Sequence, residues 1–265
     1  MNPSLVLASF RSEWIKLRRR TLLFGTFGGL AAAASLFMVL VFTQAAMRGG
    51  GSDLPSLQQL AQPNGLIHGL DRAIILLGIV AFGISAAQIA SEYSLGTLRQ
   101  LLVRQPRRAG LLTGKFLAVI SFLVCAVAFA AVVAFGAALL MAAARHVPVG
   151  AWFSGTGVSD LLKALGDLLL GVTGFATLGL MVGLFLRSSV FAVILGFAYL
   201  LPVEQLVMRI FPSTIHWLPG QLLQSVGSGG GEGSAFGRSL LLSALYLAVV
   251  SGAALVYFSR RDVTA

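Results

Sequence analysis

Few side chains in this sequence are placed to do chemistry on a substrate. Ser85 lies within an apolar stretch, where a serine nucleophile would need a neighbouring base such as histidine. The histidines, His68, His146 and His216, each fall in a different segment outside the apolar stretches, and no two of them have the spacing of metal ligands. The one cysteine, Cys125, excludes an internal disulfide. The sequence therefore predicts no catalytic residue and no metal site, and packing is the better interpretation of Ser85.

The stretch nearest to a nucleotide-binding motif runs from Gly110 through Gly114 to Lys115. A phosphate-binding loop of the form Gly-x-x-x-x-Gly-Lys-Ser/Thr needs one more residue between its glycines and a hydroxyl side chain after the lysine to ligate Mg²⁺. Phe116 occupies that last position and offers no ligand. We therefore do not expect this chain to hydrolyse ATP, to be an enzyme or to hold a cofactor of its own.

The composition is that of a membrane protein. Hydrophobic residues make up 57% of the chain and charged residues 11%, with a mean hydropathy of +0.90, whereas soluble domains have about 25% charged residues. Six apolar stretches each provide roughly the 20 residues that a helix needs to cross the hydrocarbon layer. We expect a single all-α integral membrane domain over residues 1–265 with six transmembrane helices. These cover about 22–45, 73–90, 116–144, 163–186, 189–208 and 239–258.

The basic residues are distributed unevenly between the two sides of this predicted topology. With the N-terminus inside, the segments 1–21, 91–115, 187–188 and 259–265 hold thirteen Lys and Arg against three acids, while the rest of the chain holds six of each. The positive-inside rule then predicts cytoplasmic N- and C-termini in a multi-pass protein of the bacterial inner membrane. The basic clusters lack the interleaving of aromatic residues that a base-stacking surface needs, so we expect no nucleic-acid partner; anionic membrane lipids explain the charge better.

The residues before the first apolar stretch predict an amphipathic helix over about 1–21. Apolar side chains recur along one helical face, at Leu7, Phe10, Trp14 and Leu17. Such a helix lies in the cytoplasmic interface of a membrane. The apolar run that follows is longer than the core of a cleaved signal peptide, so we interpret it as a signal anchor.

The segment 209–238 between the last two apolar stretches is expected on the outer side. Its first part is semi-apolar, with Trp217 and Pro219, and is too short to span the membrane, so a re-entrant piece over 209–223 is one interpretation. Its second part, from Gly227 to Gly237, is rich in glycine and serine and flexible by composition.

Two pairs of glycines within the apolar stretches are spaced four residues apart. They are Gly25 with Gly29 and Gly179 with Gly183. This spacing lets helices approach one another closely. We interpret both pairs as packing contacts within the chain.

The most informative polar segment is 92–115. Leu95, Leu98 and Leu102 form an apolar stripe with Leu101 beside it, and Pro106 ends the predicted helix. A short amphipathic helix at the cytoplasmic surface is either a lipid-surface helix or a docking element for a soluble partner, and the physical argument favours neither. Arg99 and Arg104 lie off the stripe.

This segment resembles the cytoplasmic loop between the second and third spans of ABC-2 type transporter permeases, commonly Glu-x-x-x-Gly-Thr-Leu-x-x-Leu-Leu-x-x-Pro-x-x-Arg followed by Gly-Lys. Pro106 comes one residue later than in that pattern, so Arg107 or Arg108 corresponds to its arginine. The N-terminal residues also resemble the elbow helix of the family, and the resemblance covers essentially the whole chain. The matching positions are Glu92, Gly96, Thr97, Leu98, Leu101, Leu102, Gly114 and Lys115, with Phe10, Glu13, Trp14, Lys16 and Leu17 in the elbow.

The resemblance implies that the loop helix inserts into a cleft of a separate ATP-binding subunit, which binds ATP and Mg²⁺. The resemblance makes Glu92 a fixed ionic or capping partner at the end of the second span. Without the resemblance, a solvated interfacial residue is the better interpretation of Glu92. The implied docking residues are Glu92, Leu95, Gly96, Thr97, Leu98, Arg99, Leu101, Leu102, Pro106, Arg107 and Arg108.

The function implied is that of a permease subunit of an ATP-driven exporter for a hydrophobic or amphipathic substrate, such as a drug, a peptide or a lipid-like molecule. Two permease chains, identical or paralogous, would pair with two ATP-binding subunits. An intramembrane enzyme and an ion-coupled carrier with six spans are the alternatives.

Candidate residues for a transport pathway lie on the second and fifth spans. Glu204 follows Pro202, which would bend the fifth span and expose the carboxylate to an outward cavity. Core packing is the competing interpretation for the aromatic residues. The candidates are Ser85, Gln88, Phe191, Phe197, Tyr199 and Glu204.

Overall fold

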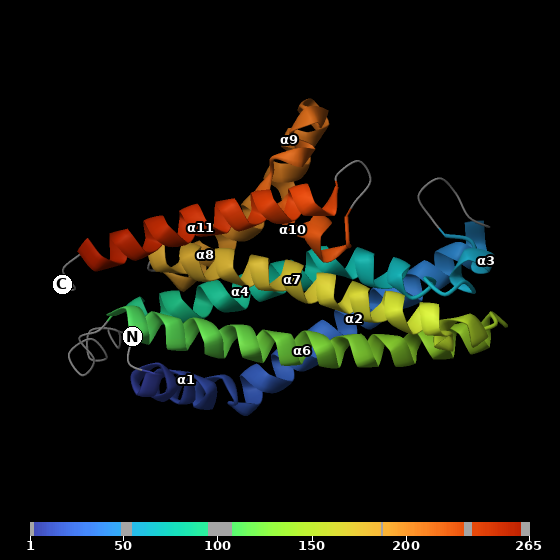
Figure 1. Cartoon of the computed structure of the whole chain (residues 1–265), viewed down its shortest axis with the longest axis horizontal. Coiled ribbons are helices and arrows are strands. Elements are labelled where there is room, and N and C mark those ends of the chain that lie inside the picture. The colour runs from blue at the N-terminus through green and yellow to red at the C-terminus, as the bar shows by residue number, and fades with distance from the viewer. Residues whose placement is uncertain (1–2, 49–54, 95–107, 187, 231–234, 261–265) are drawn as a thin grey trace.

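The computed structural model describes residues 3–48, 55–94, 108–186, 188–230 and 235–260 (Figure 1). Every regular element within these ranges is helical. Six of the helical segments are long and apolar enough to cross a membrane. The structure thus confirms the predicted all-α fold, and the chain is a multi-pass membrane protein.

The helices are longer than the apolar stretches that predicted them. The spanning helices are α2 (Arg20–Arg48), α4 (Ile67–Ser94), α6 (Arg108–Ala144), α7 (Gly155–Leu186), the pair α8 (Ser189–Ala198) and α9 (Glu204–Ile210), and α11 (Phe236–Arg260). The shorter elements are α1 (Pro3–Leu17), α3 (Leu57–Leu60), η1 (Gly150–Phe153), η2 (Tyr199–Val203), η3 (Pro212–His216) and α10 (Pro219–Gly227).

Helix α4 begins before the predicted span 73–90. His68, Asp71 and Arg72 precede that span but belong to the first turns of this helix, because helical hydrogen bonding continues beyond the apolar window that marks the hydrocarbon. His68 is therefore the one histidine of the described ranges that lies within a candidate span.

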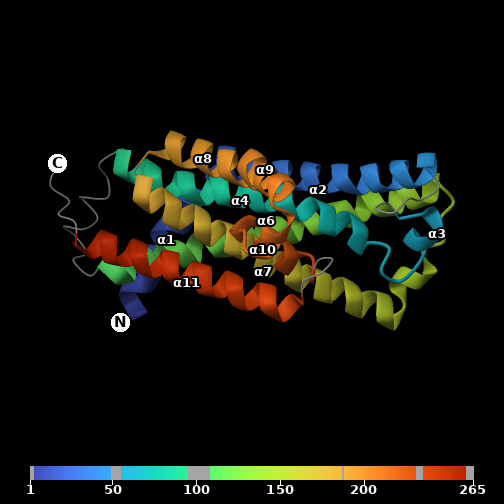
Figure 2. The same ribbon diagram turned by 90° about the horizontal axis from the view of Figure 1, so that it is seen from above.

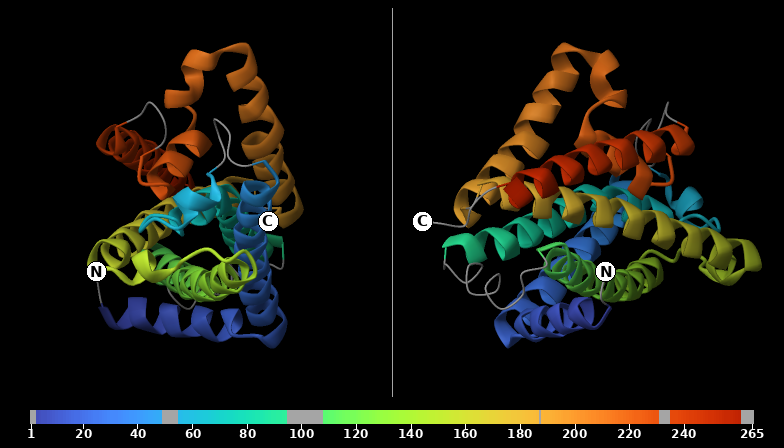
Figure 3. Two further views of the ribbon diagram at one scale, coloured as in Figure 1. Left: turned by 90° about the vertical axis from the view of Figure 1, so that its right-hand side faces the viewer. Right: turned by 60° about the vertical axis from the view of Figure 1, so that its left-hand side comes forward.

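The helices form an elongated bundle in which α4 and α7 pack together along their length (Figure 2). Helix α6 packs against α2, while α8 lies against α4. Helix α1 runs across the bundle rather than along it and lies beneath α6 (Figure 3, left). An orientation across the spanning helices is the one expected for a helix in the membrane interface.

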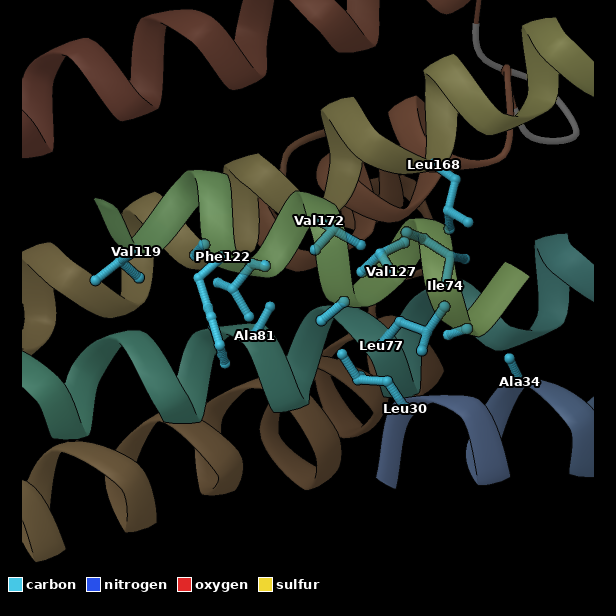
Figure 4. Packing of buried hydrophobic residues seen from close by; sticks show 14 of the residues in the cluster. Leu30, Ala34, Ile74, Leu77, Ala81, Val119, Phe122, Val127, Leu168 and Val172 are labelled. Atoms are coloured by element: carbon cyan, nitrogen blue, oxygen red, sulfur yellow. The ribbon is translucent and has the colours of Figure 1, made fainter. Parts of the chain in front are cut away.

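Helices α2, α4, α6 and α7 supply most of the main apolar core, to which α11 adds Ala254 (Figure 4). Lipid is as apolar as these side chains, so the core stabilises the bundle through close packing more than through removal of surface from water. The labelled core residues are Leu30 and Ala34 of α2, Ile74, Leu77 and Ala81 of α4, Val119, Phe122 and Val127 of α6, and Leu168 and Val172 of α7.

The two glycine pairs have different roles. Gly179 and Gly183 lie directly against the backbone of α4, where a Cβ would collide with the carbonyl oxygen of Phe82 or approach that of Ala86. This confirms packing within the chain for that pair. The same interpretation is wrong for Gly25 and Gly29, because a Cβ at either position would meet no atom of the described residues within 4 Å apart from the backbone of its own helix. Spacing alone could not distinguish the pairs, since it does not show which helix face meets a neighbour.

The fifth span bends where the sequence predicts it. Pro202 lacks the N–H that would continue the α-helical pattern, and residues Tyr199–Val203 form one π-helical turn in which the N–H of Glu204 donates to the carbonyl of Tyr199. Beyond this turn α9 leaves the bundle (Figures 1 and 3). The chain then returns through η3 to α10, which packs against α7 and α11. Residues Pro219–Gly227 of the predicted outer segment are thus an integral part of the bundle.

Candidate functional site

Four charged side chains meet where α1, α4 and α6 come together. The ammonium nitrogen of Lys115 lies 2.8 Å from Glu13 Oε2 and 2.6 Å from Glu92 Oε1. The ammonium nitrogen of Lys16 lies 2.7 Å from Glu13 Oε1 and 2.9 Å from Glu92 Oε1. We call these four residues the charge cluster. Two acids and two bases alternate in it, so its formal charge is balanced.

Three of the four side chains are withdrawn from solvent. Lys115 is 1% exposed, Glu13 4% and Glu92 8%, whereas Lys16 remains 38% exposed. A buried charge is costly unless an opposite charge compensates it. Each buried acid here is bonded to both lysines, so the cluster depends on all three helices being in place.

The charge cluster lies at the two helix ends on either side of the segment 95–107. Glu92 lies near the end of α4 and Lys115 lies in the second turn of α6, so these two residues flank the segment 95–107. Glu13 and Lys16 lie on α1. The cluster therefore joins α1 to the end of α4 and the start of α6, the two helix ends that border the segment 95–107.

Gly114 allows α1 to reach this position. A Cβ at Gly114 would lie 2.6 Å from the Cβ of Ser9 and 2.7 Å from the carbonyl oxygen of Val6. Both distances are shorter than real Cβ contacts allow, so a larger residue would push α1 away from α6. The adjacent Gly114 and Lys115 thus supply the close approach and the charge that the docked helix requires.

The aromatic face of α1 docks it on α6. Phe10 stacks on Trp14 with ring centroids 5.6 Å apart, and Trp14 contacts the edge of Phe122 at 6.3 Å. Leu17 is fully buried, while Leu7 is half exposed. The predicted apolar face is confirmed for its C-terminal three positions, which contact protein rather than lipid alone.

Opposing effects set the ionisation of the two α1 members of the cluster. Burial alone would raise the pKa of Glu13, but the charges and hydrogen bonds of Lys115 and Lys16 outweigh it and hold the pKa below its usual value of 4.5. Burial alone would lower the pKa of Lys16, but hydrogen bonds and charge from Glu13 and Glu92 raise it above its usual 10.5. Both groups are therefore ionised at neutral pH.

We expect the docking of α1 to be constant between about pH 5 and pH 10 and to weaken outside this window. The lowered pKa of Glu13 means that its contribution is present above its unfolded-state pKa and is lost as the pH falls through the folded-state value. The raised pKa of Lys16 means that its contribution is lost as the pH rises through the folded-state value. Trp14 fluorescence, in a background with Trp152 and Trp217 changed to Phe, measures this.

Glu13→Gln is the control for the acid limb, since it removes the titrating group and should reduce the transition at low pH. A transition in Trp14 fluorescence centred between pH 6 and pH 9 would contradict the assignment of these charges.

Most of the residues that are predicted to dock on an ATP-binding subunit lie outside the described residues. Glu92 lies within them, and its ion pairs favour the fixed ionic partner over the solvated residue. Arg108 begins α6, but its side chain is outside the description. The predicted docking residues that fall outside are Leu95, Gly96, Thr97, Leu98, Arg99, Leu101, Leu102, Pro106 and Arg107.

The candidate pathway residues do not form one site. Gln88 and Phe197 line a common groove of about 450 Å³ between α2, α4 and α8. Ser85 is fully buried, and its hydroxyl contacts no hydrogen-bonding partner among the described residues, so it has no base to activate it. Phe191 is 71% exposed on the outside of α8. Tyr199 lines a different cavity, between α4, α7, α8, η2 and α10.

Glu204 differs most from its expected environment. It is 1% exposed instead of facing an open cavity, because α10 returns and covers it. Its Oε1 accepts the backbone N–H of Gly220 at 2.9 Å, and its Oε2 lies 3.5 Å from Gln221 Nε2. A carboxylate at this place takes the role of an N-terminal cap for α10, whose own N-cap, Leu218, has no side-chain oxygen.

Two features of the site were not predicted from the sequence. The matched motif includes Lys115, but nothing in the motif indicated that Glu13 would be the partner of this lysine. The available signal was that Lys115 lies in a helix that continues as a membrane span, where a lysine requires an acid nearby. The partnership of Glu204 with Gly220 joins residues sixteen positions apart. No local pattern predicts it.

Comparison with known proteins adds a family. No curated protein matches this sequence. One family matches over residues 29–264, a range that begins within α2, includes the spanning helices after it and leaves out α1. The chain belongs to this family, described as "Protein of unknown function (DUF2705)".

Proposed function

We propose that this chain is the membrane-spanning permease subunit of an ATP-driven ABC-2 type exporter, with both termini in the cytoplasm of a bacterial inner membrane. A separate ATP-binding subunit supplies ATP hydrolysis, and the segment 95–107 docks on it. The observation that carries the proposal is the charge cluster, which connects α1 to both ends of this segment.

The cluster offers a physical route for coupling. A displacement of the segment 95–107 by a partner acts first on the end of α4 and the start of α6. Buried ion pairs resist separation, so α1 moves together with these two helix ends. The close packing of α4 on α7 and of α6 on α2 carries the movement into the rest of the bundle.

The groove between α2, α4 and α8 is a candidate surface for the pathway. It has a volume of about 450 Å³, and Gln88 and Ser91 add polar groups to a mainly apolar lining. The groove is formed at the side of the bundle, so a second permease chain would be needed to enclose it. An identical or paralogous partner therefore belongs to the proposal, together with a hydrophobic or amphipathic substrate.

We expect Leu98→Asp to abolish capture of the ATP-binding subunit while the membrane helices remain folded. Leu98 belongs to the predicted apolar stripe, and losing a buried leucine at a contact costs roughly 1.5–3 kcal/mol even before the cost of burying a charge. The measurement is a pull-down from membranes in which the tagged chain is co-expressed with an ATP-binding cassette subunit encoded beside it.

Leu98→Met is the matched control, because it conserves volume and hydrophobicity and should keep the partner bound. Wild-type chain that captures no ATP-binding subunit would contradict the proposal. Capture by Leu98→Asp at the wild-type level would show that the segment rests on lipid instead of docking.

A further inference from the structure

A second cavity lies on the opposite side of the bundle from α1, where the fifth span bends. It has a volume of about 380 Å³ and lies between α4, α7, α8, η2 and α10. This size falls within the range of small-molecule sites, roughly 300–1,000 Å³. Its walls are almost wholly apolar, and they include Phe82, Leu178, Val182, Tyr199, Leu200 and Pro219.

The buried carboxylate of Glu204 lies behind one end of this cavity and does not itself line it. Val203, which lines the cavity, immediately precedes Glu204, and Pro219 immediately precedes Gly220, whose N–H donates to the carboxylate. A Cβ on Gly220 would collide both with Glu204 Oε2 and with Leu200, another lining residue. The carboxylate thus lies directly behind the wall that Leu200, Val203 and Pro219 form.

The π-helical turn creates this arrangement. In an ordinary α-helix, residues five apart point about 140° away from each other, because each residue turns the chain by about 100°. The wider turn over Tyr199–Val203 brings Tyr199 and Glu204 onto one side of the helix, and the Tyr199 hydroxyl lies beside the carboxylate. Single π turns of this kind are frequent at functional sites.

The charge of Glu204 is not compensated by a basic side chain within the described part of the chain. Among the residues that the structure describes, no lysine, arginine or histidine nitrogen lies within 4 Å of its carboxylate, in contrast to the two acids of the charge cluster. Its partners are the neutral donors of Gly220 and Gln221. An ionisable residue inside a membrane bundle is costly, and a ligand of opposite charge would offset that cost.

We propose that this cavity binds an amphipathic organic cation, whose apolar part fills the space between Phe82, Val182 and Leu200 and whose positive charge lies at the end of the cavity nearest to Glu204. The inference deepens the proposed export function, on which it rests, by naming the chemical class of the substrate. Tyr199 supplies an aromatic wall next to the carboxylate, a surface that also attracts cations.

Matched probes separate charge from shape. We suggest 4-phenylbutyltrimethylammonium as the cation and its neutral carbon isostere, in which carbon replaces the nitrogen. Binding is measured by calorimetry on the purified full chain in lipid nanodiscs, with the heat from empty nanodiscs subtracted. This assay needs no ATP-binding subunit, so its failure is distinguishable from failure of the proposed function.

Glu204→Gln keeps an oxygen acceptor for the Gly220 N–H and removes only the charge. We expect it to weaken binding of the cation about tenfold and to change binding of the neutral isostere less than about twofold. Asp160→Asn, which removes an acid at the start of α7, is the control and should change neither. Val182→Trp fills the cavity and should weaken both probes.

Four results would overturn the proposal. The first three are a wild-type chain that does not prefer the cation to its isostere, a Glu204→Gln variant that binds both probes as wild type does, and a Glu204→Gln variant that loses both probes equally. The third result would assign Glu204 a purely structural role as the cap of α10. The fourth is a Val182→Trp variant that binds both probes normally, which would exclude this cavity.

Discussion

Replacing Lys115 by methionine is expected to detach α1 from the bundle. The ammonium group of Lys115 is bonded to both Glu13 and Glu92, and it is the most buried member of the charge cluster. Methionine keeps much of the length and packing of the side chain and removes the charge. Two buried carboxylates then face each other with only Lys16 to compensate them, and breaking a buried pair costs about 3–5 kcal/mol.

The measurement is the free energy of unfolding in detergent, together with Trp14 fluorescence as a local reporter of α1. Lys16→Met serves as the matched control, because Lys16 is 38% exposed and solvent compensates for part of its loss, so we expect a smaller effect. Adding Glu92→Gln to Lys115→Met should recover part of the stability, since it removes one of the uncompensated charges. An unchanged Trp14 environment in Lys115→Met would contradict the cluster.

Gly179→Leu is expected to be the most damaging single change in the membrane core. Even the Cβ of a larger residue would collide with the Phe82 carbonyl oxygen on α4, and backbone cannot give way as the end of a side chain can. The α4–α7 contact would have to open, at a cost of about 3 kcal/mol or more. We expect little folded protein in the membrane and a lowered melting temperature for what remains.

Gly29→Leu makes the same chemical change at a glycine whose Cβ position has no neighbouring atom within 4 Å. It should leave the melting temperature of the isolated chain close to that of wild type. Equal losses in the two variants would mean that glycine matters through helix flexibility rather than through contact between α4 and α7.

The number of spanning helices and their order could be predicted from the sequence because a helix in lipid must be apolar over its whole circumference. The same uniformity hides which face packs against a neighbour, so Gly25 and Gly179 looked alike. The bend at Pro202 was predictable because it is a local backbone effect. The burial of Glu204 was not, since it depends on α10 returning from further along the chain.

The charge cluster was predictable in part. The motif singled out Glu92 and the elbow singled out Glu13 and Lys16, but their meeting through Lys115 requires the docked position of α1. This geometry also has a consequence for mutants. An arginine at position 92 would face Lys16 and Lys115, so Glu92→Arg should destabilise the docking of α1.

Native mass spectrometry of the complex purified from membranes tests the central claim most directly. Our account predicts an assembly with two permease chains, each either this 27.8-kDa chain or a paralogue of it, and two ATP-binding subunits. Charge-cluster variants that keep α1 docked, such as Lys16→Arg, should give the same assembly. A chain that is recovered without any ATP-binding subunit, or one permease chain alone with its ATPase, would contradict the account.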